Sequence, residues 1–178
     1  MKIIRFDKKI NFNKAYIYKS PIGDLIITSD DNYQYITSLE FNLNDNHTII
    51  KDEEPSIIKK AKKELDNYFS NSLKKFSLPL AVYGTDFQYN VWIETSKIPF
   101  GKVLTYSDIA RNVSYKKGSI SRAVGMAEGK NNIAIIIPCH RVVGVNKKLT
   151  GYAGGLYKKE YLLKHEGFDI LDSKIIIK

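Results

Sequence analysis

The sequence predicts a small α/β unit followed by a mostly helical unit. Three observations lead to this expectation. The first 45 residues alternate short runs of β-branched and aromatic residues with turn residues, a pattern typical of strands. Residues 55–69 then change to the helical period. After residue 85 come several short helical segments separated by glycine and proline. We therefore expect one domain over residues 1–84 and a second over residues 85–178.

The first unit begins with three strand-like runs, at residues 15–18, 25–28 and 35–41. Turn residues such as Pro and Gly separate these runs, and tightly connected strands pair antiparallel. We therefore expect a small antiparallel sheet, with the helix over residues 55–69 packed against it. Residues 70–84 have no clear period and are expected to connect the two domains.

The second unit has the outline of a helix-turn-helix. A helix is expected over residues 87–96, and Thr105 with Asp108 resembles a capping box that begins the next helix. After a break at Lys-Lys-Gly, Ser119 is placed to cap a further helix that ends at Glu128. Two short helices with a glycine-bearing break in a basic region are typical of DNA-binding pairs, although many other helical pairs look similar.

The remainder of this unit holds an apolar run, a tight loop and a last helix. Residues 133–137 are too short for a typical helix and too apolar for a surface loop, so they form a buried strand or core segment that ends at Pro138. Residues 151–155 form the loop. The helix over residues 156–166 is expected to end at Gly167.

Composition limits the class of protein. No run of 18 apolar residues is present, and charged residues interrupt the first segment, so we expect neither a membrane span nor a signal peptide, and a cytoplasmic location. A single cysteine excludes an internal disulfide and a multi-cysteine metal site. The three histidines have no zinc-site spacing. We therefore expect no metal and no cofactor.

Positive charge is concentrated in the second half. The net charge of +9 divides into +2 over residues 1–84 and +7 over residues 85–167. A cationic half favours a polyanionic partner, with nucleic acid first and an anionic membrane second. A basic surface that serves only solubility is the alternative.

The strongest chemical motif is the sequence Pro138-Cys139-His140-Arg141. A cysteine thiol is mostly protonated at neutral pH, so a nucleophilic cysteine needs a neighbouring base or positive charge. Adjacent residues on a strand point to opposite faces, so Cys139 and His140 can cooperate only if the chain turns there. Pro138 makes such a turn plausible. The alternative is a buried structural cysteine, since free cysteine is among the most buried residue types.

The motifs IIIPCHRVVG, GYAGGLYKKEYLLKHEG, FGKVLTYSDIA and SRAVG resemble those of the methylated-DNA–protein-cysteine methyltransferases (O6-alkylguanine-DNA alkyltransferases). The resemblance runs from about residue 85 to residue 167, with the motifs in order, and extends more loosely to SPIGDLIIT and FSLPL in the first half. It implies a ribonuclease-H-like N-terminal domain and a C-terminal helix-turn-helix domain, winged-helix-like, that holds the active site.

The resemblance also implies roles for individual residues. Cys139 matches the alkyl acceptor, His140 the general base that acts through a water, and Glu166 the carboxylate that orients it. Tyr106 matches the residue that rotates the target nucleotide and donates a hydrogen bond to N3 of the base. Asn131 matches the asparagine that ties the recognition helix to the cysteine loop.

Further residues match the DNA-binding surface and the pocket wall. Arg122 matches the arginine that fills the stack after the base is extruded. The other expected DNA-binding residues are Ser119, Ala123 and Arg111, together with Tyr106, and the expected pocket residues are Val142, Tyr152 and Ala153.

The expected function is direct repair of double-stranded DNA that contains O6-alkylguanine, with O4-alkylthymine as a second candidate substrate. The base must be extruded to expose O6. We expect a monomer that reacts once, because the product is a stable thioether. The first alternative is a non-catalytic helix-turn-helix protein that binds alkylated DNA; a DNA-binding regulator and a cysteine hydrolase are the others.

Two departures from the family pattern stand out. The family commonly has Asn-Pro-x-Pro-Ile before the apolar run, and the segment Asn131-Asn132-Ile133-Ala134-Ile135 lacks both prolines. That loop is expected to be more mobile. Glu128 falls late in the expected recognition helix, where an acid beside DNA is expected to lower affinity or limit bulky adducts.

Overall fold

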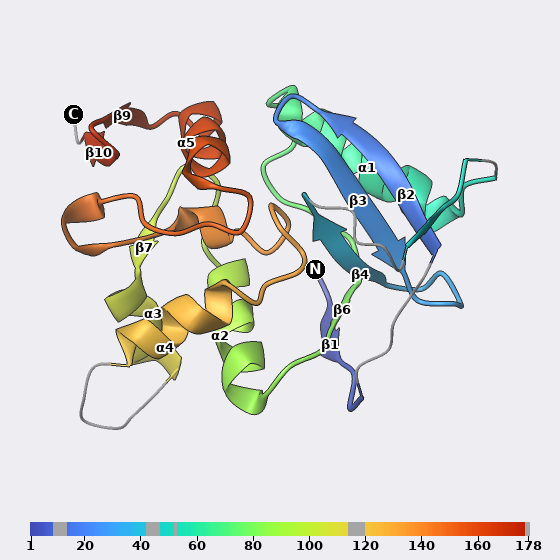
Figure 1. Ribbon diagram of the computed structural model, residues 1–178, viewed down its shortest axis with the longest axis horizontal. Coiled ribbons are helices and arrows are strands. Elements are labelled where there is room, and N and C mark those ends of the chain that lie inside the picture. The colour runs from blue at the N-terminus through green and yellow to red at the C-terminus, as the bar shows by residue number, and fades with distance from the viewer. Residues whose placement is uncertain (9–13, 42–46, 52, 114–119, 177–178) are drawn as a thin grey trace. The chain divides into compact units, whose positions relative to one another are not determined.

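The computed structural model describes residues 1–8, 14–41, 47–51, 53–113 and 120–176 (Figure 1). The chain forms two compact units, Met1–Gly84 and Thr85–Lys178, which are described separately below. No helix in the described ranges is long and apolar enough to cross a membrane.

The first unit is built on a six-stranded sheet with the strand order β1-β6-β4-β3-β2-β5. The expected antiparallel meander forms its centre, because β2 pairs with β3 and β3 with β4 in antiparallel register. The strands are β1 (Ile3–Arg5), β2 (Lys14–Ser20), β3 (Gly23–Ser29), β4 (Ile36–Glu40), β5 (Thr48–Ile49) and β6 (Leu80–Val82).

The sheet extends beyond the expected antiparallel strands. Strand β6 pairs in parallel with β1 and β4, and β5 pairs in parallel with β2, so the sheet is mixed. The segment over residues 70–84, expected to be only a connector, contains β6. All three residues of β6 are buried, so the strand shows no alternation of polar and apolar residues. Its pairing with β1 joins residues far apart in the chain, which local patterns do not report.

Helix α1 (Ser56–Phe69) covers one face of this sheet and contacts β2, β3 and β4 (Figure 1). Its buried residues follow the helical period, as expected: Ile57, Ile58, Ala61, Glu64, Leu65 and Tyr68. Glu64 accepts a hydrogen bond from the backbone N–H of Ser77 at 2.8 Å, which fixes the chain that leads into β6.

Three helices pack together at the start of the second unit: α2 (Asp86–Ser96), α3 (Tyr106–Val113) and α4 (Ser121–Glu128) (Figure 1). The Thr105–Asp108 capping motif is present, since Thr105 Oγ1 accepts from Asp108 N at 3.1 Å and Asp108 Oδ2 accepts from Thr105 N at 2.7 Å. Trp92 Nε1 donates to the Ala127 carbonyl at 3.0 Å and joins α2 to α4. Ser119, the expected cap of α4, lies outside the described residues.

The remainder of the unit surrounds a short turn that carries the cysteine. The 3₁₀ turn η1 (Cys139–Arg141) leads into β8 (Val142–Val143), which pairs in parallel with β7 (Leu104–Thr105). The turn η2 (Val145–Lys147), helix α5 (Leu156–His165) and a hairpin of β9 (Asp169–Leu171) and β10 (Lys174–Ile176) follow. Gly167 has a φ of 91°, which suits the glycine expected after α5.

Residues 133–137 are a core segment rather than a strand. All five are buried, but the segment consists mainly of turns, and Ile135 has a φ of 68°. A left-handed isoleucine is unfavourable in isolation, so the packing around it must hold this conformation. The run therefore places a folded loop, not an extended strand, directly before Cys139.

Candidate active site

The second unit contains a cavity of about 1020 Å³ that includes Cys139. Helices α3 and α4 form one part of its wall, and the chain that follows β8 forms another. The lining residues are Thr105, Tyr106, Ser107, Ser121, Arg122, Gly125, Met126, Glu128, Gly129, Cys139, Gly144, Val145, Thr150, Gly151, Tyr152 and Ala153.

Cys139 is buried and lies in the turn that Pro138 begins. The turn required for cooperation with His140 is therefore present. Burial, with the nearby charge of Glu128, raises the pKa of the Cys139 thiol to about 12, although a hydrogen bond from Asn131 and the charge of Lys159 act in the opposite direction. The sulfur is consequently a thiol at neutral pH, and a base must remove its proton when it reacts.

Asn131 connects the end of α4 with the cysteine turn. Its Nδ2 donates to the Ile137 carbonyl at 2.9 Å and lies 3.2 Å from Sγ of Cys139, and its Oδ1 accepts from the backbone N–H of Ile133 at 3.0 Å. The amide therefore spans the folded loop of residues 133–137 and places a donor on the sulfur. This geometry is present without the two prolines of the family pattern.

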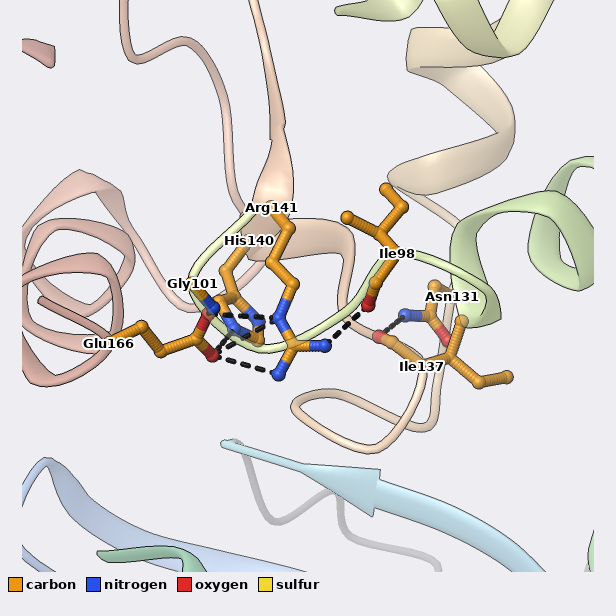
Figure 2. Close-up of polar contacts among 7 residues, drawn as sticks. All are labelled: Ile98, Gly101, Asn131, Ile137, His140, Arg141 and Glu166. Carbon is orange, nitrogen blue, oxygen red and sulfur yellow. Dashed lines mark hydrogen bonds and ion pairs between the residues drawn. The ribbon is translucent and has the colours of Figure 1, made fainter. Parts of the chain in front are cut away.

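His140 and Glu166 form a buried pair (Figure 2). His140 Nε2 and Glu166 Oε1 are 2.8 Å apart. Burial lowers the pKa of His140 and outweighs the opposing effect of the carboxylate, so the ring is neutral near pH 7. Because a carboxylate only accepts hydrogen bonds, Nε2 is the donor and Nδ1 carries the free lone pair.

Arg141 is a second partner of Glu166, and its role was not foreseen from the sequence. Its Nε and Nη2 donate to the carboxylate at 2.9 Å, and its Nη1 donates to the Ile98 carbonyl (Figure 2). The Gly101 N–H also donates to Glu166. Burial by itself raises the pKa of Glu166. His140 and Arg141 outweigh this effect and lower the pKa to about 2, so the acid stays ionised. The available signal in the sequence was the position of this cation, directly before the two apolar residues Val142 and Val143.

Tyr106 begins α3 and lines the cavity. Its hydroxyl oxygen accepts from Thr150 Oγ1 at 3.3 Å. Burial raises the pKa of Tyr106, so its hydroxyl is protonated and available as a donor. Lys159 lies 5.9 Å from the Tyr106 ring centre.

Lys159 is fully buried, which was also not foreseen from the sequence. Its Nζ donates to the carbonyls of Val142 at 2.7 Å and Thr150 at 2.9 Å. Burial lowers its pKa to about 8. The signal was present, since Lys159 precedes Leu162 and Leu163 by three and four residues and therefore shares the core face of α5.

Glu128 does not lie on an exposed face beside DNA. Glu128 is only 6% exposed to solvent and lines the cavity. Its Oε1 accepts a hydrogen bond from the Thr95 hydroxyl of α2. Burial raises its pKa to about 7. The expectation of an acid on the DNA-facing surface is corrected, because the Glu128 side chain, in the last turn of α4, bonds to Thr95 of α2 instead of lying on the exposed side of the helix.

The other expected site residues fall into three groups. Tyr152, Ala153 and Arg122 line the cavity, and Arg122 is exposed. Val142 is fully buried in β8 and is not part of the lining, so it supports the pocket through its carbonyl bond to Lys159. Arg111 is exposed and paired with Asp108, and Ala123 is half-buried on α4 outside the lining.

The second unit thus joins three packed short helices to a buried cysteine that lines a cavity and is followed by a histidine paired with a glutamate, the nucleophile, base and orienting carboxylate of a protein with a nucleophilic cysteine. Residues 86–168 match the model of the 6-O-methylguanine DNA methyltransferase DNA binding domain, and residues 14–82 match that of the ribonuclease-like domain of the same proteins. The chain belongs to the 6-O-methylguanine DNA methyltransferase family, which confirms the expected two-domain architecture.

Individual relatives agree with this assignment. The chain is 43% identical to a methylated-DNA–protein-cysteine methyltransferase of Methanosarcina acetivorans, over 85% of this chain and 96% of the relative. It is 40% identical to the constitutive enzyme of that name from Bacillus subtilis, over 83% and 92%. The structure of Mycobacterium tuberculosis OGT in complex with DNA is similar, with a TM-score of 0.76, 36% identity and coverage of 86% and 92%.

Proposed function

We propose that this protein repairs alkylated DNA by transferring the alkyl group from O6 of guanine to Sγ of Cys139, once per molecule. One observation carries the proposal: the single cysteine of the chain lines the cavity of the DNA-binding domain, next to the buried His140–Glu166 pair. The chain also aligns over most of its length with methylated-DNA–protein-cysteine methyltransferases.

The first requirement is to remove the thiol proton. Nε2 of His140 is bound to Glu166, and Nδ1 is buried without a hydrogen-bond partner among the described residues. In the proposed mechanism a water relays the Cys139 proton to this nitrogen. Glu166 stays ionised and stabilises the imidazolium that results, as the third member of a nucleophile–base–orienter chain.

The second requirement is to release guanine. As the sulfur–carbon bond forms, the bond between that carbon and O6 breaks, and its electron pair passes to the guanine ring. The protonated hydroxyl of Tyr106 donates a hydrogen bond to N3 and so stabilises this developing negative charge. The product is a thioether, which water does not cleave. The protein is therefore consumed by one transfer.

The proposed partner is double-stranded DNA in which the target nucleotide is extruded into the cavity. Arg122, exposed at the cavity on α4, is proposed to fill the vacated place in the stack. Arg111 and Ala123 on the same helical pair are proposed to contact the DNA backbone. We further propose that the protein acts as a monomer and in the cytoplasm.

Mass spectrometry of the intact protein tests the proposal. After incubation with a duplex that carries O6-methylguanine, the mass should increase by one methylene, and a peptide digest should place the methyl group on Cys139. The Cys139→Ser variant should bind the duplex but gain no mass, because a neutral hydroxyl is a far weaker nucleophile.

Each other result has a clear meaning. Binding without any change in mass would favour the non-catalytic binder. Repeated conversion of substrate by an unmodified protein would favour a hydrolase. Methylation of the Cys139→Ser variant at the wild-type rate would remove Cys139 from the mechanism.

A further inference from the structure

Glu128 lines the cavity that contains Cys139. Its Oε1 accepts from the Thr95 hydroxyl, while its Oε2 is buried and has no hydrogen-bond donor among the described residues. A buried acceptor without a partner is rare and costs free energy, so its retention calls for an explanation. A ligand group that enters the cavity is one way to provide the partner.

The carboxyl group lies among the groups that surround the reacting cysteine. Charged or titratable groups interact with it from three elements: Cys139 on η1, Tyr106 on α3 and Lys159 on α5. From α2, its neighbour is the uncharged Thr95. After burial itself, the charge of Glu128 is the next cause that raises the pKa of Cys139, and it also helps to raise that of Tyr106. Glu128 therefore lies at the reactive end of the cavity.

We propose that Glu128 is a specificity-determining residue whose unpartnered carboxyl oxygen favours alkyl groups that carry a hydroxyl over apolar alkyl groups of the same size. The inference rests on the proposed transfer to Cys139, because the alkyl group must then approach Sγ at this end of the cavity. A methyl group is too small to interact strongly with the carboxyl, so the preference applies to longer adducts.

The chemistry of the hydroxyl suits either protonation state of the acid. A hydroxyl donates to a carboxylate and accepts from a carboxylic acid, so it satisfies Oε2 in both forms. A methyl group at the same position leaves that oxygen unpaired. Two adducts make a size-matched comparison, because the 2-hydroxyethyl and propyl groups have the same number of non-hydrogen atoms and differ in one terminal group.

The test measures the rate of transfer to Cys139 from duplexes that carry O6-(2-hydroxyethyl)guanine or O6-propylguanine. The quantity compared is the ratio of the two rates in the wild type, Glu128→Met and Glu128→Gln. Glu160→Gln is the matched control, because Glu160 lies on α5 and pairs with Lys164 near the surface. Glu128→Met alone leaves the Thr95 hydroxyl without its acceptor. The double variant Thr95→Val with Glu128→Met removes that hydroxyl as well.

We expect Glu128→Met, alone or with Thr95→Val, to lower the ratio of the hydroxyethyl rate to the propyl rate about tenfold. This is the effect of losing one buried hydrogen bond to the hydroxyl of the adduct. Glu128→Gln and Glu160→Gln should keep the ratio within about twofold of the wild type, since a buried amide still bonds to a hydroxyl. An unchanged ratio in both methionine variants, or an equal fall in Glu128→Gln, would overturn the proposal. So would a wild type that prefers propyl.

The same experiment separates this inference from the proposed function. Wild-type protein is first incubated with O6-methylguanine in the same duplex. If it gains no methyl group, the proposed function fails. If it is methylated on Cys139 and the ratios do not change as expected, only the role of Glu128 fails.

Discussion

The carboxylate of Glu166 and the ring of His140 meet 2.8 Å apart, with both side chains fully removed from solvent. The two residues are 26 positions apart in the chain, one at the end of α5 and the other in the cysteine turn. Arg141 and the Gly101 N–H bind the same carboxylate. One acid thus compensates a buried cation and orients a buried imidazole, which makes it important for stability as well as for the proposed chemistry.

Removal of this acid should destabilise the second unit strongly. Glu166→Ala leaves the Arg141 guanidinium buried without its counter-ion. We expect the free energy of unfolding to fall by about 3–5 kcal/mol, as for other buried pairs that lose one partner. Urea denaturation followed by tryptophan fluorescence measures it, since Trp92 lies in this unit and is the sole tryptophan of the chain. The partly exposed pair of Glu160 and Lys164 provides the control.

In the control, Glu160→Ala should change the free energy of unfolding by less than about 1 kcal/mol, because exposed ion pairs contribute little. An equal loss in both variants would mean that burial of Glu166 does not determine its contribution.

The stability difference between Glu128→Gln and the wild type should depend on pH. The pKa of Glu128 is raised from 4.5 to about 7. Below pH 4.5 the acid is protonated in both folded and unfolded states, so it contributes no penalty. As pH rises from about 4.5 to 7, the unfolded state releases the proton while the folded state still holds it, so the wild type loses stability that a glutamine does not lose.

The expected size follows from the shift. Between about pH 4.5 and pH 8, the stability of Glu128→Gln relative to the wild type should increase by up to about 3 kcal/mol. Urea denaturation of both proteins across this range measures the difference. A constant difference, or one that decreases with rising pH, would mean that the buried carboxyl does not titrate as described.

Tyr106 and Arg122 should differ in their dependence on the DNA duplex. Tyr106→Ala and Arg122→Ala should both slow transfer from duplex O6-methylguanine, because both residues are assigned to base extrusion. Only Tyr106→Ala should strongly slow reaction with free O6-benzylguanine, which requires no extrusion. Rates of Cys139 alkylation with the two substrates provide the measurement. If Arg122→Ala slowed both reactions equally, its assignment to the DNA stack would be wrong.

Binding to duplex DNA should weaken with salt and show no preference for sequence. For about three to five neutralised phosphates, log K should fall against log salt with a slope of roughly −3 to −4.5. Arg111→Ala and Arg122→Ala should each make the slope less steep. We expect the same of Lys116 and Lys117, which lie in the basic break between the two helices in the sequence; both are outside the described residues, and their variants belong in the same series.

The matched controls are Lys59→Ala and Lys60→Ala on α1 of the first unit, where the net charge is only +2. Fluorescence anisotropy at several salt concentrations measures all of these slopes. A slope controlled by Lys59 and Lys60 would place the DNA on the first unit, and an affinity independent of salt would mean that these cations do not bind phosphates.

Local sequence signals were sufficient for the elements whose causes are local. The Thr105–Asp108 capping motif, the apolar period of α1 and the turn at Pro138 each depend on residues a few positions apart. The family motifs added candidate roles for Cys139 and Glu166. These features could be predicted because the interactions that produce them follow the order of the chain.

Tertiary structure decided the features that depend on distant residues. The sequence does not reveal that β6 completes a mixed sheet, since its three residues acquire their pairing only from β1 and β4. Nor does it reveal that Arg141 shares Glu166 with His140, or which partners Lys159 and Glu128 have near Cys139. A charged side chain is buried only when folding supplies partners that offset its lost hydration, and those partners come from other elements. The sequence by itself therefore indicated which group is proposed to react, and the tertiary structure decided the charges and hydrogen bonds that surround it.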